Sequence, residues 1–256
     1  MLDLITPLVL TYNEAPNLGR ALMSLAWARR IVVVDSGSSD ETLKILAGHR
    51  AVEVFHRDFD SFAAQTHFGL EKIATPFTLS LDADYVLMPA LVEEIRQLDP
   101  ASADAWYAGF VYCVQGKPLR ATLLPPRLVL HRTQTVRYVN DGHAHRAVPP
   151  ARVARLKGRV LHDDRKPLSR WMSSQIRYSK QEADKLAPSR WQDLSWPDRC
   201  RRLLLGPLLV PLHCFVFKGL FLDGYRGLHY TFQRTIAEVL LALRLLDRWI
   251  ADDHRE

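Results

Sequence analysis

Residues 77–84 read FTLSLDAD, an apolar run of strand-favouring residues that ends in two aspartates separated by one alanine. The run predicts a buried strand over 77–81. Three earlier runs have the same character, and segments with helical spacing separate them. We expect strands at 5–11, 31–35 and 52–55, and helices at 15–26, 39–47 and 61–73. This alternation predicts an α/β fold in which helices cover both faces of a parallel sheet.

Polar side chains follow three of these strands at the point where each strand ends. Because ligands bind beyond the carboxyl ends of parallel strands, their position indicates a binding site at that edge of the sheet. The residues are Thr11, Asn13 and Glu14 after the first strand, Asp35 after the second, and Asp82 and Asp84 after the fourth. The segment 35–40 also has the composition of a turn and helix cap, in which Ser39 or Asp40 would begin the next helix and Gly48 would end it.

Asp82 and Asp84 are candidate ligands of a divalent cation. Carboxylate oxygens suit Mg²⁺ or Mn²⁺, and such an ion would bridge the two phosphates of a nucleotide. An isolated Asp-x-Asp also occurs on solvated loops. Phosphatases with an aspartyl nucleophile use the same spacing, but there it follows the first strand, which here ends in Thr11-Tyr12-Asn13-Glu14.

The second half of the chain has a different pattern. Residues 104–146 are irregular and strand-like, Gly158–Leu161 predicts one more short strand, and helical spacing continues from Leu168 to the end. We therefore predict a catalytic domain over 1–165 and a helical region over 166–256. The three cysteines have no paired spacing, which favours reduced thiols and a cytosolic environment, and the N-terminus does not have the pattern of a signal peptide.

Several segments together resemble the family 2 glycosyltransferases, whose fold is called GT-A. They are LVLTYNEAPNLGRALMSL (8–25), IVVVDSGSSDET (31–42), SFAAQTHFGL (61–70) and FTLSLDAD (77–84). Two later segments resemble the subgroup that acts on the lipopolysaccharide core: LKGRVLHDDRKPLSRWMSSQIRYSKQEADKL (156–186) and FKGLFLDGYRGL (217–228). The resemblance implies a GT-A-like mixed sheet flanked by helices, with a membrane-associating helical C-terminus.

The resemblance also implies roles for individual residues. Thr11, Asn13 and Glu14 would contact the uracil–ribose end of a UDP-sugar, and Asp35 would read the base or ribose. Gln65 and, more weakly, His67 would lie near the donor, although both suit one polar face of a helix. Asp82 would contact the donor and, with Asp84, hold the metal. His162 would complete the metal shell, a role for which His143 and His145 compete.

An inverting transfer also needs a general base that takes the proton of the acceptor hydroxyl. The subgroup suggests a His-Glu pair, but residues 141–146 read DGHAHR, with Arg146 where a glutamate is expected. Arginine does not act as a base near neutral pH. Asp141 is therefore our first choice, with an Asp-Gly turn as its structural alternative and Asp163 or Asp164 next. Arg127 and Arg132 are candidates to offset the charge of the diphosphate.

Residues 203–222 form an apolar run that contains Pro207, Pro211, His213 and Lys218. These residues argue against a membrane span, and the flanking cations and aromatic rings favour a segment at the lipid headgroup boundary. A buried helical hairpin is the alternative, and a span is the third choice. Between Arg152 and Thr235 there are 17 Lys/Arg against 7 Asp/Glu, which suits an anionic membrane or acidic acceptor.

Taken together, the sequence predicts an inverting, metal-dependent transferase at the cytoplasmic face of the inner membrane, attached peripherally. It would move a sugar from a nucleotide-sugar, UDP-linked by expectation, to a lipid-linked saccharide such as the lipopolysaccharide core. Two alternatives are a polyprenyl-phosphate acceptor and an inactive, membrane-docked nucleotide-sugar binder, which Arg146 favours. A nucleic-acid partner is not expected, because long aliphatic runs interrupt the basic residues.

Overall fold

The four expected strands of the N-terminal half all form, as a parallel sheet in the order β3-β2-β1-β4. The structure is a computed structural model that describes residues 1–141 and 144–253, with the side chains of residues 144, 145 and 252 left undescribed. A 3₁₀ turn, η1, precedes the sheet at Leu2–Leu4. The strands are β1 (Ile5–Thr11), β2 (Ile31–Asp35), β3 (Val52–His56) and β4 (Phe77–Asp82). The predicted α/β architecture is confirmed.

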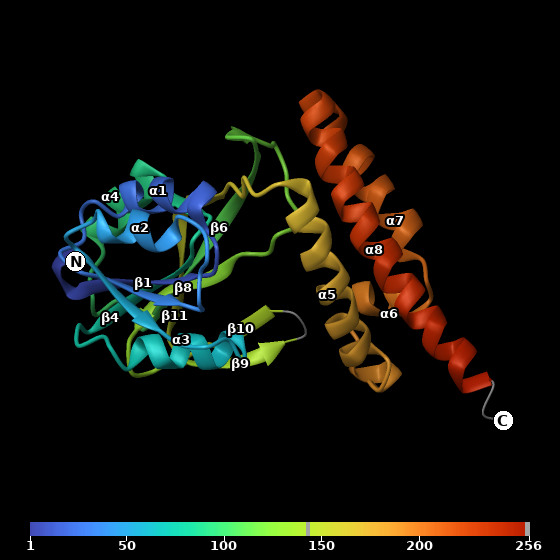
Figure 1. The fold of residues 1–256 in the computed structure, drawn as a ribbon, viewed down its shortest axis with the longest axis horizontal. Helices are drawn as coiled ribbons and strands as arrows, with labels where there is room; N and C mark the ends of the chain where they lie inside the picture. The colour runs from blue at the N-terminus through green and yellow to red at the C-terminus, as the bar shows by residue number, and fades with distance from the viewer. Residues whose placement is uncertain (142–143, 254–256) are drawn as a thin grey trace. The chain divides into compact units, whose positions relative to one another are not determined.

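The intervening helices are shorter than the sequence pattern indicates. They are α1 (Ala15–Ser24), α2 (Thr42–Ala47) and α3 (Phe62–Leu70). Neither Ser39 nor Asp40 caps α2, because Asp40 Oδ1 accepts from the backbone N–H of Thr42 in a turn that puts Glu41 at the N-cap. In Figure 1, α1 and α2 lie on one face of the sheet and α3 lies on the other.

Four further strands, from later in the chain, extend the sheet beyond β4 and make it a mixed sheet. Beyond β4 the order is β8-β6-β11-β5, and in the described chain the sheet has nine strands, with β7 pairing β6 at the side. β8 is antiparallel to both β4 and β6, β11 is parallel to β6, and β5 is antiparallel to β11. The bounds are β5 (Tyr85–Leu87), α4 (Pro89–Gln97), β6 (Ala105–Val114), β7 (Lys117–Pro118), β8 (Arg127–Arg132) and β11 (Val153–His162).

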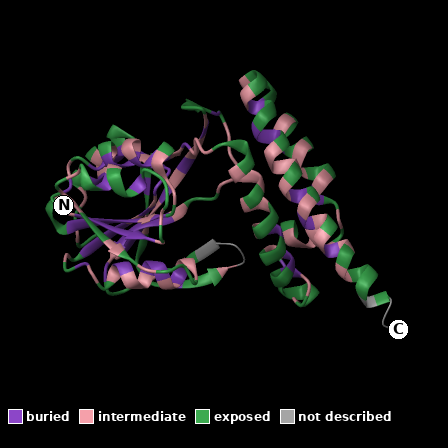
Figure 2. Cartoon of the chain, in the orientation of Figure 1, coloured by how far each residue is buried: buried purple, intermediate pink, exposed green. Residues whose placement is uncertain are grey.

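The chain divides into two units. The first contains Met1–Pro118, Leu124–Asn140 and His145–Lys166, and the second contains Leu119–Leu123, Asp141–Ala144 and Pro167–Glu256. The boundary expected at residue 165 therefore leaves out two short segments that join the helical unit. A separate two-stranded sheet consists of β9 (Arg137–Asp141) and β10 (Ala144–Val148). Buried side chains concentrate in the strands of the first unit, as Figure 2 shows.

The second unit is helical. Its elements are α5 (Leu168–Leu186), the 3₁₀ turn η2 (Trp191–Asp193), α6 (Trp196–Arg202), α7 (Gly206–Leu212), the π-helical η3 (His213–Phe217), the 3₁₀ turn η4 (Leu220–Asp223) and α8 (Gly224–Asp253). The long helix α8 contacts α5, α6 and α7. Within the described residues, no helix alone has the length and apolarity of a membrane span, whereas Gly206–Phe217 and Leu220–Ala251, bent by 69°, reach them only as a pair.

Candidate functional site

Thr11, Asn13 and Asp35 lie together at the carboxyl ends of β1 and β2. Thr11 Oγ1 donates to Asp35 Oδ1 over 3.0 Å, and Asp35 Oδ2 accepts from the backbone N–H groups of Gly37 and Ser38. Asn13 has a positive φ of 55°, and its Oδ1 accepts from the backbone N–H of Ser39. These side chains satisfy one another, so they hold the loop 36–40 against the end of β1. The turn interpretation of Asp35 is correct, and the nucleotide role of all three residues stays a prediction.

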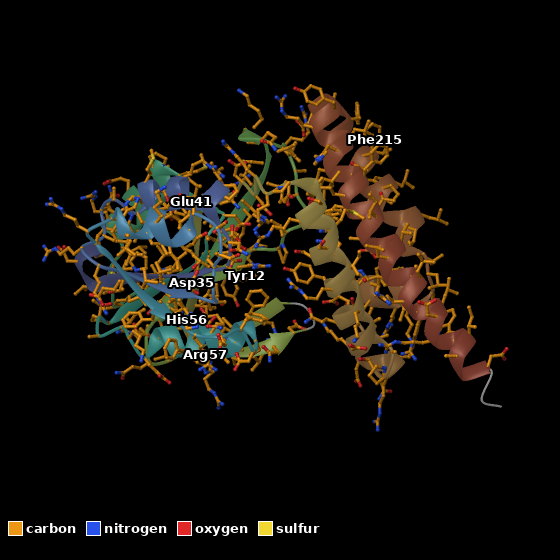
Figure 3. All side chains as sticks on the ribbon, viewed as in Figure 1. Tyr12, Asp35, Glu41, His56, Arg57 and Phe215 are labelled. Carbon is orange, nitrogen blue, oxygen red and sulfur yellow. The ribbon has the colours of Figure 1, made fainter. Side chains whose placement is uncertain are left out.

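The next strand end, at β3, is held by Gln65. Its Nε2 donates to the carbonyl oxygens of Arg57 and Asp58, over 2.9 Å each, while its buried Oε1 has no hydrogen-bond partner. Figure 3 shows Tyr12, Asp35, His56 and Arg57 at this end of the sheet. His67 is directed elsewhere: its Nε2 accepts from the backbone N–H of Tyr138. Gln65 therefore remains a candidate donor residue, and His67 has a structural role.

Asp84 and His162, which are 78 residues apart, are in direct contact. The antiparallel pairing of β5 and β11 places His162 opposite Tyr85, and the backbone N–H of Asp163 donates to the carbonyl of Asp84. His162 Nε2 consequently lies 3.0 Å from Asp84 Oδ2. The rings of Tyr85 and Tyr112 pack edge-on against the imidazole. The structure thus brings together two of the three metal ligands that the sequence predicted.

Burial and the charge of the partner act in opposite directions on the pKa of each residue in this pair. Burial raises the pKa of Asp84, but the charge and hydrogen bond of His162 outweigh it and lower the pKa to about 2. For His162, burial lowers the pKa, and the charge and hydrogen bond of Asp84 more than reverse this effect, so the pKa is raised. Asp84 Oδ1 and His162 Nδ1 are buried and have no hydrogen-bond partner. Buried polar atoms without partners are rare and call for an explanation.

The residues at this position fit a divalent cation in part. Two ligand atoms about 3.0 Å apart match adjacent positions around an octahedral ion with bonds of about 2.1 Å. Asp84 Oδ2 and His162 Nε2 have that separation, and Asp84 Oδ1 needs a partner. Within residues 1–141 and 144–253, however, no group of three or more His, Cys, Asp or Glu side chains is arranged to hold a metal. Asp82 is the missing member of the predicted set.

Asp82 is directed toward a cation of the protein instead. Its Oδ2 lies 3.7 Å from Arg127 Nη1, and the same nitrogen donates to the hydroxyl of Tyr85. Burial, followed by the charge of Asp82, raises the pKa of Tyr85 well above its usual value, so the phenol stays neutral. Arg127 is therefore at the carboxyl end of β4, where a diphosphate charge was expected to be offset.

Arg132 was the other arginine proposed for the diphosphate, and that expectation was wrong. Because β8 runs antiparallel to β4, Arg132 pairs with Phe77 at the opposite end of the strand. There its Nε donates to Asp104 Oδ1 over 2.8 Å, and Arg152 forms an ion pair with the same carboxylate. The spacing of five residues along one strand separates the two arginines by the length of that strand.

A residue that the sequence interpretation missed, Lys166, lies at the centre of the site. Its Nζ is 2.7 Å from Glu14 Oε1 and 3.5 Å from Asp164 Oδ1. The buried Asn17 donates from Nδ2 to both Glu14 Oε2 and Asp164 Oδ1. Burial lowers the pKa of Lys166, but Asp84, Glu14 and Asp164 outweigh this effect and raise it. The only sequence signal was the position of Lys166 four residues after His162 and two after the paired aspartates.

Glu14 is ionisable near neutral pH in this environment. Burial, opposed by Lys166 and reinforced by Asp84, raises the pKa of Glu14 to about 7. In the resting structure its two carboxylate oxygens are engaged by Lys166 and Asn17. Contact with a ribose or base, as the sequence predicted, would have to compete with these two interactions.

Asp163, a secondary choice for the general base, has a structural role. Its Oδ1 accepts from the backbone N–H of Gly116, and its Oδ2 accepts from Arg165 and lies 3.3 Å from Arg20 Nε. Two arginines and a backbone donor therefore occupy both oxygens of this carboxylate. It anchors the segment that carries His162 and Lys166.

Asp141 belongs to the second unit, where Lys185 Nζ lies 2.6 Å from its Oδ1. Arg146, at the position where a glutamate was expected, is exposed on β10. Gly142 and His143, and the side chain of His145, lie outside the described residues, so the alternative histidine ligands are not placed. The assignment of Asp141 as a base stays a prediction, now with Lys185 as its immediate neighbour.

Comparison with known proteins is consistent with this fold. A model of the family described as glycosyl transferase family 2 matches residues 8–152. The lipopolysaccharide core biosynthesis glycosyltransferase LpsC of Rhizobium meliloti (strain 1021) is 24% identical over 258 residues, which cover 95% of this chain and 92% of LpsC.

Two solved structures share the fold. S. aureus TarS 1–349 in complex with UDP-GlcNAc has a TM-score of 0.52 at 16% identity, with 94% of this chain and 89% of that chain covered. The mannosyltransferase PcManGT from Pyrobaculum calidifontis, in complex with GDP-Man and Mn²⁺, has a TM-score of 0.54 at 14% identity, with 94% and 86% covered. Of a longer TarS chain, this chain spans 45%.

Proposed function

This chain belongs to glycosyl transferase family 2, and we propose that it is an inverting enzyme that moves a sugar from a nucleotide-sugar to a lipid-linked saccharide. The observation that carries the proposal is the buried contact between Asp84 and His162 at the carboxyl ends of the strands, with Lys166 and Arg127 nearby. Cations and potential metal ligands at that edge suit the diphosphate of a donor.

The proposed donor is a UDP-sugar. Thr11, Asn13, Glu14 and Asp35 lie at the ends of β1 and β2, and Gln65 of α3 contacts the segment after β3. The backbone and remaining polar atoms at this edge suit a nucleoside. TarS 1–349, which shares the fold, was solved with UDP-GlcNAc, whereas PcManGT was solved with GDP-Man. A guanine donor is therefore the alternative that a donor screen must include.

The proposed cofactor is Mg²⁺ or Mn²⁺, which Asp84, His162 and Asp82 would hold. When bound, the ion would offset negative charge on the leaving diphosphate. The unpartnered Oδ1 of Asp84 and the presence of Mn²⁺ in the PcManGT complex support this assignment. Lys166 and Arg127 would add positive charge from the protein itself.

Asp141 is the proposed general base. To accept the proton of the acceptor hydroxyl, its carboxylate must exchange the ion pair with Lys185 for a hydrogen bond to that hydroxyl. Before the acceptor arrives, Lys185 would provide the counter-charge beside the carboxylate. Attack opposite to the leaving diphosphate would invert the configuration at the sugar carbon.

The proposed acceptor is a saccharide of the lipopolysaccharide core, because LpsC aligns over nearly the whole of this chain. The proposed location is the cytoplasmic face of the inner membrane, where a peripheral protein reaches a lipid-linked substrate. Cys113, Cys200 and Cys214 are free and buried, which supports a reducing compartment. The basic region from Arg152 onward supports an acidic or phosphorylated acceptor.

Nucleotide release by the purified chain tests the proposal. UDP- and GDP-sugars are incubated with Mn²⁺, with and without lipopolysaccharide extracted from membranes, and the freed nucleotide is measured. We expect slow release from one donor alone and much faster release with the acceptor. Nucleotide binding without release from any donor, with or without acceptor, would instead identify an inactive binder and overturn the proposal.

A further inference from the structure

The helix α8 has two opposite apolar faces, and the second unit covers only one of them. On the covered face, Leu241 and Leu245 pack with Ala183 and Leu186 of α5, and Glu238 forms an ion pair with Arg201. On the same face, the hydroxyl of Tyr230 accepts from the backbone N–H of Leu123 and lies 3.4 Å from Thr122 Oγ1. These contacts account for the folding of α8 onto its own unit.

The other face is a continuous apolar stripe that is open to solvent. Its most exposed members are Tyr225 at 72%, Phe232 at 58% and Ile250 at 57%. The stripe, which we call the α8 stripe, consists of Tyr225, Leu228, Phe232, Ile236, Val239, Leu243 and Ile250, with the half-buried Leu246 in the remaining turn. At about 100° per residue these positions point in one direction, away from Leu241 and Leu245. An uncovered apolar face of this length marks a surface that binds something apolar.

Basic side chains border the α8 stripe. Arg226 and Arg244 are eighteen residues apart, which is five helical turns, so they project on the same side of the stripe. Between Asp223 and Asp247 the only acidic residue is Glu238, which is buried against Arg201. Along 225–250, Arg226 and Arg244 therefore stand against one exposed carboxylate, Asp247, so the border of the stripe is net positive and complements an anionic surface.

The preceding segment has the same character. Leu208 and Phe217, on α7 and η3, are 71% and 74% exposed, and Leu212 and Val216 are exposed between them. Pro211 lies inside α7, the left-handed Gly219 ends the segment before η4, and Figure 1 shows α7 beside α8. The break at Gly219 and the 69° bend are unsuited to a straight span but are compatible with helices that lie along a surface.

We propose that the α8 stripe, together with the exposed apolar residues of α7 and η3, is an in-plane docking surface for an anionic lipid bilayer. Apolar side chains would enter the headgroup boundary, while Arg226 and Arg244 contact lipid phosphates.

A second copy of this chain is the competing occupant, and the charges disfavour it. Pairing of two α8 stripes would bring two borders of net positive charge together, with Asp247 as the one exposed acidic residue along 225–250 to oppose Arg226 and Arg244. Like charges beside a helix–helix interface are destabilising. An anionic bilayer meets both the apolar stripe and the basic border.

Vesicle flotation of the full chain tests the inference. Vesicles of phosphatidylcholine alone are compared with vesicles that contain about 30% phosphatidylglycerol, each at low and at high salt. We expect flotation with the anionic vesicles, weakened by salt, and at least tenfold weaker binding of the double variant Phe232→Glu/Leu243→Glu. Arg226→Gln/Arg244→Gln should reduce binding to anionic vesicles and leave binding to neutral vesicles unchanged.

Met23→Glu is the matched control, because Met23 is 73% exposed on α1 of the first unit. It adds one negative charge, against two in the double variant, at an exposed apolar position outside the stripe, so it should float like the unchanged protein. Circular dichroism establishes that each variant is folded, since every changed residue is exposed or half-buried. Failure of the unchanged chain to float, or equal flotation of Phe232→Glu/Leu243→Glu, would overturn the inference.

Self-association is measured on the same samples by sedimentation velocity. A monomer supports the bilayer as occupant, whereas a dimer that Phe232→Glu/Leu243→Glu dissociates would identify a second copy and overturn it. The inference rests on the proposed function only for its purpose, which is to bring the site to a lipid-linked acceptor. Vesicle binding needs neither donor nor acceptor, so its failure and a failure of nucleotide release are distinguishable.

Discussion

His162 Nε2 lies 3.0 Å from Asp84 Oδ2, and each residue has a second polar atom that is buried without a partner. The pairing of β5 with β11 creates this contact, because it places His162 opposite the neighbour of Asp84. A protonated imidazole and a cation compete for the same carboxylate. The site should therefore exchange a proton for a metal ion.

Manganese affinity should rise with pH. Asp84 raises the pKa of His162 above 6.5, and the imidazole must lose its proton to become a ligand. Below that raised pKa we expect about a tenfold gain in affinity per pH unit, measured by titration calorimetry. His162→Gln should bind more weakly and lose this slope. An identical slope in His162→Gln would show that the histidine is not a ligand.

Asp84→Ala should abolish metal-stimulated nucleotide release. The change removes the carboxylate whose oxygens face His162 and leaves a buried imidazole without its counter-charge. We expect a loss of at least a hundredfold in turnover, measured with saturating Mn²⁺, while circular dichroism remains unchanged. Glu71→Ala, an exposed carboxylate just after α3, is the control and should retain activity. Full turnover in Asp84→Ala would remove the metal role.

Glu14 should make folding less favourable as the pH rises. Its pKa is about 7 in the folded protein against 4.5 as the ordinary value, so the ionised form is disfavoured by folding. The free energy of unfolding should fall between pH 4.5 and 7 and then level off, by at most about 3 kcal/mol from this group. Lys166 stays charged through this window, because its pKa is raised.

The test compares urea unfolding of the unchanged chain and Glu14→Gln at pH 5 and pH 8. At pH 8 the free energy of unfolding should be larger for Glu14→Gln than for the unchanged chain. If it is larger for the unchanged chain instead, the ion pair with Lys166 outweighs the cost of burying the Glu14 carboxylate.

Asp141→Asn should lower transfer by about a hundredfold or more and leave the affinity for UDP within a factor of two, because an amide does not accept the proton. Lys185→Met removes the ion pair over 2.6 Å and leaves the carboxylate in place. This variant should retain transfer. A silent Asp141→Asn would move the base to Asp164, since Asp163 is engaged by Arg20, Arg165 and Gly116.

Gly158→Ala should destabilise the first unit by about 1–3 kcal/mol. A Cβ at this position would lie 2.6 Å from the backbone Cα of Leu91, where α4 packs against β11. Backbone atoms do not yield as a flexible side chain does. Thermal unfolding measures the change, and Gly19→Ala, which meets nothing within 4 Å, should leave the melting temperature equal or higher.

The local pattern of the sequence was sufficient for the four parallel strands, since buried strands with helices between them have few alternative arrangements. It also predicted that Asp82, Asp84 and Thr11 lie at one edge of the sheet, because polar residues directly after buried strands reach that edge. Family resemblance added His162 to this set. The helix ends were less accurate, as α2 shows, since a turn at Asp40 competed with the expected cap.

Tertiary structure alone decided which of these groups meet. The antiparallel direction of β8 separates Arg127 from Arg132, and the pairing of β5 with β11 joins Asp84 to His162. Lys166 is part of the site because Asn17 and Arg20 hold the segment after β11 by hydrogen bonds. Contacts between residues far apart in the chain depend on strand direction and register, which hydrophobic spacing within a single segment does not encode.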